Sequence, residues 1–138
     1  MCLINDRRQD RRIGEWISSC VDVRYQPSNV CFGVEENGEL IGAAMLNEYN
    51  GSNICIHQRI SRPRGMTRGL LKSAFSFAFD HLRVARVTGV VKISNQKAID
   101  INLRMGFEVE GVLKRYLPDG DGYVHMVMWK ENCKFIGG

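Results

Sequence analysis

The chain has 138 residues and a formal net charge of +4, with 44% hydrophobic and 25% charged residues. This composition is close to the average of soluble globular proteins, and the length suits one domain, so the disordered, fibrous and disulfide-miniprotein classes are excluded. No segment approaches the roughly 18–20 consecutive apolar residues of a membrane span, and the N-terminal residues lack the apolar run of a secretion signal. We therefore expect a single cytoplasmic domain over residues 1–138 that does not bind a membrane.

The mild positive charge favours an acidic ligand, but the basic residues do not form the stripe that is typical of nucleic-acid-binding proteins. We therefore do not expect a nucleic acid as partner. The five cysteines and three histidines are scattered, without a C-x-x-C pair or another metal-ligand spacing. We predict no metal site, and reduced thiols that lie mostly in the core. The cysteines are Cys2, Cys20, Cys31, Cys55 and Cys133.

Apolar residues and turn signals divide the first half of the chain into short elements. Apolar side chains recur at spacings of three and four from Ile13 to Cys20, which indicates an amphipathic helix that buries them. The Asn37-Gly38 pair between two apolar runs is a strong hairpin signal. The expected elements are a strand at 2–4, a helix at 6–20, and strands at 30–34, 40–46 and 53–60. These strands predict an antiparallel meander.

The second half changes to helical spacing and then alternates between helix and strand. Apolar residues from Leu70 to Leu82 predict a helix that starts near Thr67, and Gly106 is the stop signal of a second helix. The expected elements are a helix at 67–82, a strand at 86–93, a helix at 95–105 with Ala98, Ile101 and Met105 inward, strands at 107–117 and 123–130, and a loose tail at 136–138. This order predicts a mixed α+β sheet.

The loop between the strand at 53–60 and the following helix has the features of an anion site. It contains Gly65 and the three arginines Arg62, Arg64 and Arg68. The first N–H groups of a helix point outward unpaired, and the helix dipole adds positive charge there. A glycine also lets backbone approach a ligand closely. These features predict a phosphate or diphosphate cradle, whereas the alternative is a basic turn whose arginines are only solvated.

The same loop resembles a known family. Its segment Arg62-Pro63-Arg64-Gly65-Met66-Thr67 is similar to the acetyl-CoA loop of the GNAT superfamily of N-acetyltransferases, Gln/Arg-x-x-Gly-x-Gly/Ala, with Thr67 in the last small position. The resemblance covers roughly residues 40–130. Within the superfamily, these residues are similar to the branch that acetylates ribosomal-protein N-termini. The residues that match that branch are Ala78-Phe79, Leu82, Val84, Arg86-Val87, Asn95, Ala98, Arg104, Gly106-Phe107, Glu110-Gly111, Leu113 and Lys114.

The resemblance implies the GNAT fold and acetyl-CoA as co-substrate, without a metal. The fold is α+β: a mixed, mostly antiparallel sheet of six or seven strands with about three helices, in which two parallel strands splay into a V that holds the pantetheine. Asn95 would touch the pantetheine, and its alternative role is a helix N-cap. The implied cofactor-binding residues are Cys55, Ile56, His57, Arg62, Arg64, Gly65, Met66, Thr67, Arg68, Gly69, Asn95, Ala98 and Asn102.

Three departures from the family pattern bear on catalysis. Thr67 replaces a smaller residue where backbone nears phosphate, and Asn102 stands where many members carry a general-acid Tyr. The segment before the first hairpin is also short, which predicts an open acceptor groove. We select His57 as candidate base, Glu48 as a base acting through water, and Tyr116 as acid. The alternatives are a packed histidine, a solvated carboxylate and a packing aromatic residue, and Tyr123 is expected to pack along the last strand.

The sequence therefore predicts an acetyl-CoA-dependent N-acetyltransferase that acylates a primary amine. An open groove favours a protein or peptide acceptor over a small metabolite, or completion of the site by a second subunit. The resemblance also makes a homodimer possible, because the last hairpin often pairs across a dimer in this family. The alternative is a GNAT-like protein without catalysis that serves as a binding or assembly component.

Overall fold

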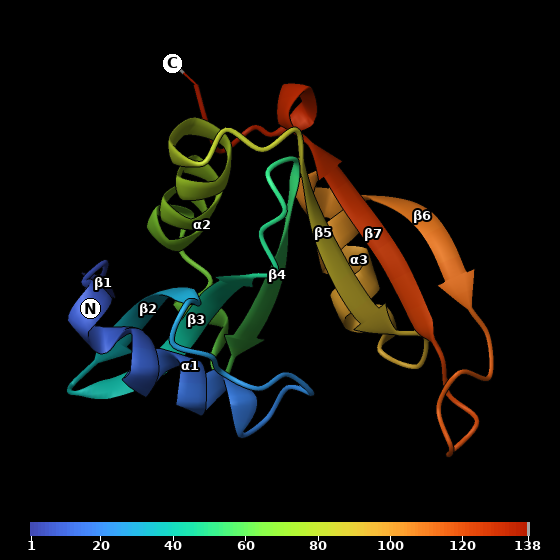
Figure 1. Ribbon diagram of the computed structural model, residues 1–138. Coiled ribbons are helices and arrows are strands. Elements are labelled where there is room, and N and C mark those ends of the chain that lie inside the picture. The colour runs from blue at the N-terminus through green and yellow to red at the C-terminus, as the bar shows by residue number, and fades with distance from the viewer. Residues whose placement is uncertain (138) are drawn as a thin grey trace.

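The computed structural model describes residues 1–137, which form one seven-stranded sheet with helices on both faces (Figure 1). The strands are β1 (Cys2–Ile4), β2 (Val30–Glu36), β3 (Glu39–Asn47), β4 (Asn53–Ile60), β5 (Arg86–Lys92), β6 (Glu108–Leu113) and β7 (Tyr123–Trp129). The α-helices are α1 (Asp10–Ser18), α2 (Arg68–Ser76) and α3 (Gln96–Met105). No helix in residues 1–137 is long and apolar enough to cross a membrane.

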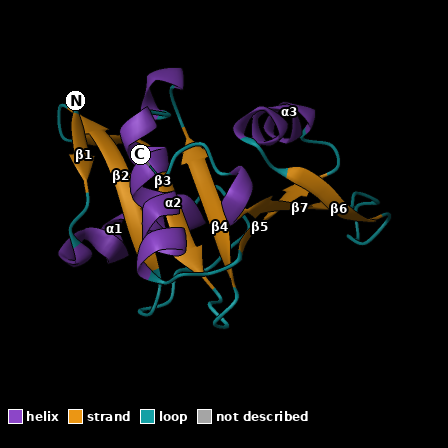
Figure 2. Cartoon of the chain, turned by 90° about the horizontal axis from the view of Figure 1, so that it is seen from above, coloured by secondary structure: helices purple, strands orange, loops and turns teal. Residues whose placement is uncertain are grey.

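The sheet has the strand order β1-β2-β3-β4-β5-β7-β6. Every neighbouring pair is antiparallel except β4 and β5, which run parallel. These two strands pair only over Asn53–Cys55 and Arg86–Thr88 and then separate. Figure 2 shows the result, since β5, β7 and β6 run in a direction different from β1–β4. The expected fold, with a splay between two parallel strands, is therefore confirmed.

Alternating side chains of the meander supply the two cores. Cys31, Ala43 and Met45 face α1, whereas the neighbouring Phe32 and Ala44 face the larger core with α2 and α3. Side chains of a strand point alternately to opposite faces of the sheet, so continuous apolar runs in β2 and β3 can bury both faces. The antiparallel pairing of β2 with β3 and of β3 with β4 confirms the predicted meander.

Local signals set the ends of the two helices beside the splay. The Thr67 hydroxyl accepts a hydrogen bond from the Leu70 N–H at 3.0 Å and caps α2. The Asn95 side chain caps α3 by accepting from the Ala98 N–H at 3.2 Å. Gly106 ends α3 with φ of 115°, a conformation that glycine adopts without strain. The helix-stop prediction is confirmed.

Other predicted boundaries are wrong in detail. The first helix is split into a 3₁₀ turn at Arg7–Gln9 and α1, so Cys20 lies beyond it and is exposed. The second helix changes to a π-helix at Phe77–His81. The α3 face buries Ile99 rather than Ala98 or Ile101, which are only half-buried. The strand at 107–117 ends at Leu113.

Two further expectations fail because of tertiary packing. The cysteines are not mostly core residues, since only Cys31 and Cys133 are buried. The C-terminal segment is not loose up to Ile136: the Phe135 ring stacks on Phe75 at 5.5 Å, and Ile136 is half-buried against the same core. Gly138, also part of the predicted loose tail, lies outside the described residues.

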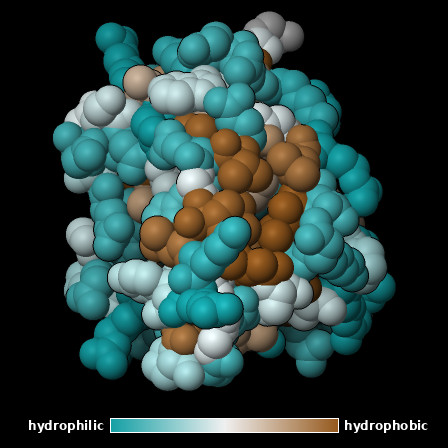
Figure 3. All heavy atoms as spheres, turned by 90° about the vertical axis from the view of Figure 1, so that its right-hand side faces the viewer, coloured by the Kyte–Doolittle hydropathy of each residue, from teal (hydrophilic) through white to brown (hydrophobic). Residues whose placement is uncertain are grey.

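Exposed apolar side chains gather on the side of the molecule where β6 lies (Figure 3). They include Val109, Val112 and Leu113 of β6 and Leu103 of α3, each at least 40% exposed. A homodimer that covers β6 would bury these side chains. The predicted homodimer stays a prediction.

Candidate active site

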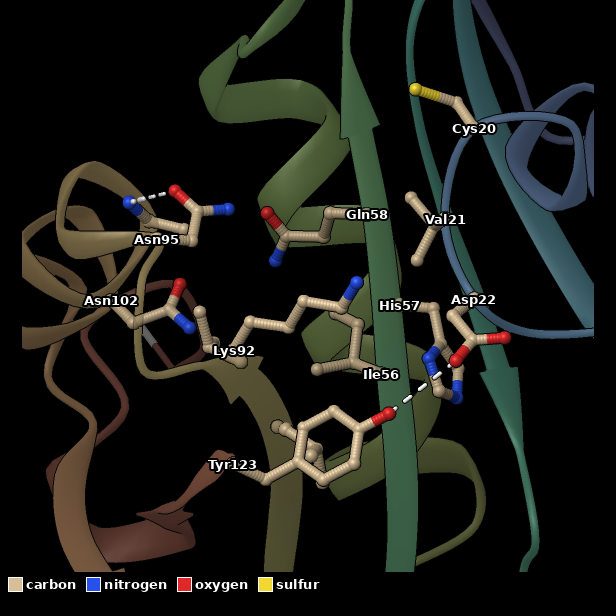
Figure 4. A pocket seen from close by; sticks show the side chains of 14 residues that line it. Cys20, Val21, Asp22, Ile56, His57, Gln58, Lys92, Asn95, Asn102 and Tyr123 are labelled. Carbon is tan, nitrogen blue, oxygen red and sulfur yellow. Dashed lines mark hydrogen bonds between the residues drawn. The ribbon is translucent and has the colours of Figure 1, made fainter. Parts of the chain in front are cut away.

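The separation of β4 from β5 creates a cleft of about 480 Å³ (Figure 4). Its walls come from β4, β5, the start of α3, the first residue of β7 and the loop after α1. The lining residues are Cys20, Val21, Asp22, Ile56, His57, Gln58, Gly89, Val90, Val91, Lys92, Asn95, Ala98, Asn102 and Tyr123. Chain segments more than 100 residues apart therefore meet in one cavity.

A polar network fixes the closed end of this V. The Arg86 guanidinium donates two hydrogen bonds of 2.7 Å to Glu110 and one of 3.1 Å to Asn53. Thr88 donates a further bond of 2.6 Å to the same Asn53 oxygen. The paired guanidinium lowers the pKa of the Glu110 carboxyl. Because the network joins β4, β5 and β6, the two parallel strands separate from a fixed point.

The predicted cofactor residues fall into two groups. Ile56, His57, Asn95, Ala98 and Asn102 line the cleft. Cys55 lies at the closed end, opposite Thr88, with its thiol 3.7 Å from a Glu48 oxygen. The loop residues 62–69 lie outside the cleft lining, in the connection from the carboxyl end of β4 into α2. The Asn95 side chain serves as an N-cap and also lines the cleft, so its two proposed roles are compatible.

Gly65 has a structural role that the sequence did not indicate, while its predicted role beside a ligand stays a prediction. A Cβ atom on Gly65 would lie 2.2 Å from the Ile41 carbonyl oxygen, and one on Gly42 would lie 2.2 Å from the Gly65 oxygen. Gly65 is buried. The missing side chain therefore serves contact with the β3 backbone, and this contact fixes the loop on the sheet.

The loop ends at the start of α2, where backbone N–H groups remain free. Thr67 supplies the cap to Leu70, and the Thr67 carbonyl oxygen accepts from the Leu71 N–H at 3.2 Å. The N–H groups of Arg68 and Gly69 have no acceptor among residues 1–137, as is usual for the first helical turn. These two N–H groups and the helix dipole could bind a phosphate. The Thr67 hydroxyl faces the helix, so the substitution of a larger residue is explained by capping.

We expect Thr67→Val to remove this cap while keeping the side-chain shape. The free energy of unfolding should fall by about 1 kcal/mol, the typical size of a lost N-cap. Urea denaturation measures the change. Thr67→Ser is the matched control, because it retains the hydroxyl, and an unchanged midpoint for Thr67→Val would contradict the capping role.

The three loop arginines are not equivalent. Arg64 donates a 2.6 Å hydrogen bond to Glu36 and is held by that ion pair. Arg62 lies 3.8 Å from a Glu39 oxygen, a looser contact between exposed groups. Arg68 forms no ion pair within residues 1–137, and its guanidinium lies 5.9 Å from the Phe135 ring centre. Arg68 is therefore the arginine best placed to serve a ligand at the α2 end.

His57 is the titratable group in the β4 wall of the cleft. Its Nε2 lies 2.9 Å from the Asn47 amide oxygen. An amide oxygen only accepts hydrogen bonds, so Nε2 carries the proton and Nδ1 holds the free electron pair. Burial lowers the pKa of His57, and the charge of Glu48 opposes this shift. The neutral form with a basic Nδ1 is therefore favoured.

The other two candidate catalytic residues are placed outside the cleft lining. Glu48 is exposed at the turn after β3, with φ of 55°, and contacts Cys55. Tyr116 is 64% exposed and packs against Tyr123 with ring centres 5.9 Å apart. In this structure neither side chain lies in the cleft beside His57.

Several cleft residues were missed by sequence reasoning. Asp22 of the loop after α1 and Lys92 at the end of β5 line the cleft, and Asn47 of β3 lies outside the lining but contacts His57. Tyr123 was expected to pack along its strand, but it faces the cleft. Alternation along β7 could have indicated this, because Val124, Met126 and Met128 are buried on the opposite face. Asp22 has no comparable sequence signal. Within residues 1–137, no cluster of three or more potential metal ligands is present.

Comparisons with known proteins agree with this geometry. The model of the acetyltransferase (GNAT) domain family matches residues 3–108. A comparison of the sequence with curated proteins finds no match. Among solved structures, the fold is similar to a mutant of spermidine N-acetyltransferase SpeG from Vibrio cholerae, with a TM-score of 0.76 and 19% identity over 99% of this chain and 98% of that chain.

A second solved structure is the spermidine N-acetyltransferase from Vibrio cholerae in complex with CoA and spermine. It has a TM-score of 0.71 and 19% identity, over 95% of this chain and 96% of that chain. The narrower resemblance to the ribosomal-protein branch finds no support in these comparisons. The match of the family model covers most of the chain, and the chain belongs to the acetyltransferase (GNAT) domain family.

Proposed function

We propose that this chain transfers the acetyl group of acetyl-CoA to a small primary amine, and that the reaction takes place in the cleft between β4 and β5. The observation that carries the proposal is the cleft itself. It has a neutral histidine in its β4 wall, and the chain leads from the end of β4 directly into the free N–H groups at the start of α2, which lie outside the lining.

The chain offers suitable groups for each part of the co-substrate. The free N–H groups of Arg68 and Gly69 and the Arg68 guanidinium suit its phosphates. The separated edges of β4 and β5 expose backbone N–H and C=O groups to its pantetheine amides, because these strands stop pairing after Cys55. The bound co-substrate supplies an activated acetyl thioester. Asn95 and Ala98 border the same cleft from α3.

His57 is the proposed general base. The free electron pair of Nδ1 accepts a proton from the acceptor amine as its nitrogen bonds to the thioester carbonyl carbon. The C–S bond then breaks, and the CoA sulfur leaves with the electron pair. Asn102 cannot protonate that sulfur, but an ordinary thiol has a pKa of about 8.5, so the thiolate is a competent leaving group. The missing tyrosine therefore does not exclude catalysis.

The acceptor proposed here differs from the sequence-based expectation of a protein or peptide. The similar solved structures are spermidine N-acetyltransferases, one of them with spermine bound. The cleft volume of about 480 Å³ also has to hold the pantetheine, so the remaining space suits a small linear amine. Asp22 also places a carboxylate in its wall, which favours a cationic acceptor. These observations support a small amine over a folded protein.

Two measurements test the proposal. Calorimetry should detect acetyl-CoA binding, and Arg68→Ala should weaken it by about 1.5–3 kcal/mol, the size of a charged hydrogen bond. Arg64→Ala is the matched control, because the Arg64 side chain is held by Glu36, and it should weaken binding less. Mass spectrometry should then show one added acetyl group on a small amine. If folded protein binds no acetyl-CoA, the enzyme assignment is wrong and the non-catalytic alternative gains support.

A further inference from the structure

The wall of the cleft contains two side chains with a formal charge, Asp22 and Lys92. Asp22 belongs to the loop that follows α1, and Lys92 ends β5. Figure 4 shows the Asp22 carboxylate beside the Tyr123 hydroxyl and near His57, whereas Lys92 extends from β5 toward β4. The cleft therefore has an anionic part on the α1 side, next to an aromatic ring.

Asp22 is exposed at the cleft, and its carboxylate is not committed to a cation of the described chain. It forms no salt bridge among residues 1–137. Its one side-chain hydrogen bond comes from the Tyr123 hydroxyl at 3.4 Å, which is long for an O–H···O bond. Burial and the neighbouring Asp22 charge both raise the pKa of Tyr123, so its hydroxyl stays neutral. A weakly engaged carboxylate beside a tyrosine ring is suited to an ammonium group, through charge and through cation–π attraction.

The group that Asp22 binds cannot be the amine that reacts. An adjacent carboxylate raises the pKa of an ammonium group and keeps it protonated, whereas the reacting nitrogen must lose its proton to His57. Burial is the main cause that lowers the pKa of His57, so the imidazole is neutral and can take up that proton. Lys92 adds a positive charge toward β4 and disfavours a second cation on that side.

We propose that Asp22 and Tyr123 form a subsite for a second, non-reacting ammonium group of the acceptor, so that the chain prefers diamines and polyamines to monoamines. This inference rests on the proposed acetyltransferase function. Asp22 and the Tyr123 ring hold the distal ammonium group, and the proximal amine reaches Nδ1 of His57. Asp22 and Tyr123 are specificity-determining residues on the α1 side of the cleft.

The test compares 1,4-diaminobutane with butylamine as acceptors at saturating acetyl-CoA. Wild-type protein should give a higher kcat/KM with the diamine. Asp22→Asn should reduce that preference by about tenfold or more, the factor expected for a lost charge-assisted hydrogen bond, mainly through KM. Glu131→Gln is the matched control, because it removes one exposed negative charge outside the cleft. Tyr123→Phe keeps the ring and should retain most of the preference, whereas Tyr123→Leu should lose part of it.

The inference would be overturned by a wild-type enzyme without the diamine preference, by an Asp22→Asn variant with the wild-type preference, or by an equal loss in Glu131→Gln. A clear preference for a basic peptide over both amines would also overturn it. If the wild type acetylates no amine, the proposed function fails. A binding measurement then tests the subsite independently of activity. A nuclear magnetic resonance titration with 1,4-diaminobutane should shift signals around Asp22 in wild type and not in Asp22→Asn, and no shift in wild type would refute the subsite.

Discussion

Replacing His57 by alanine is expected to lower kcat/KM for amine acetylation by roughly 10²–10⁴-fold, the usual contribution of a general base. The loss should appear mainly in kcat, while acetyl-CoA affinity stays close to the wild-type value. The reason is that the imidazole faces the cleft with a free Nδ1, whereas the phosphate-binding groups lie at the start of α2. Steady-state kinetics and calorimetry measure the two quantities separately.

The pH dependence of the activity is a second test of His57 as the general base. Burial disfavours the imidazolium form, so the pKa of His57 lies below the ordinary value of about 6.5. The base is therefore competent at pH 7, and activity should fall as the pH drops through this lowered pKa and His57 takes up a proton. The His57→Ala variant should lack this acidic limb, while any limb from the substrate amine remains at higher pH.

Asn47 offers a control that separates positioning from chemistry. Asn47→Ala removes the acceptor of the Nε2 proton, so both tautomers of His57 become accessible and activity should fall less than in His57→Ala. Nitrogen chemical shifts of the imidazole report the tautomer directly. A His57→Ala variant that keeps more than half of the wild-type kcat/KM would end the base assignment, since base catalysis is worth at least about 10²-fold.

Local signals explain what could be predicted from the sequence. The strand expected at 53–60 has the same bounds as β4, the Asn37-Gly38 turn joins β2 to β3, and Gly106 ends α3. Each depends on residues that are adjacent in the chain, so spacing and turn chemistry suffice. The parallel placement of β4 beside β5 followed from the family resemblance, not from such local patterns.

The acceptor side of the cleft could not be predicted in the same way. Asp22 and Tyr123 are 101 residues apart in the sequence, and Asn47 meets His57 only through the register of β3 with β4. No spacing rule connects such residues before the fold is known. Gly65 shows a second limit, because a glycine indicates a close approach without telling whether a ligand or the chain's own backbone approaches.

The contact between Gly65 and β3 leads to the second large expected effect. Gly65→Ala should lower the free energy of unfolding by about 1–3 kcal/mol, the usual cost of overpacking, or more, because the clashing Ile41 oxygen belongs to backbone in the middle of the sheet. Backbone in a paired strand cannot give way as a flexible side chain can. Gly42→Ala would clash with Gly65 from the other side and should be similarly destabilising.

The same substitution should weaken acetyl-CoA binding indirectly. If the loop moves off β3 to make room for the methyl group, the start of α2 and its free N–H groups move with it. Gly69→Ala is the matched control for stability, because its methyl group would lie 3.5 Å from Leu3, an ordinary contact, and alanine favours helix by up to about 1 kcal/mol over glycine. Urea denaturation should therefore order the variants with Gly69→Ala at or above wild type and Gly65→Ala well below it. A Gly65→Ala protein as stable as wild type would mean that Gly65 does not fix the loop on β3. The remaining explanation for the glycine would then be the close approach of a ligand.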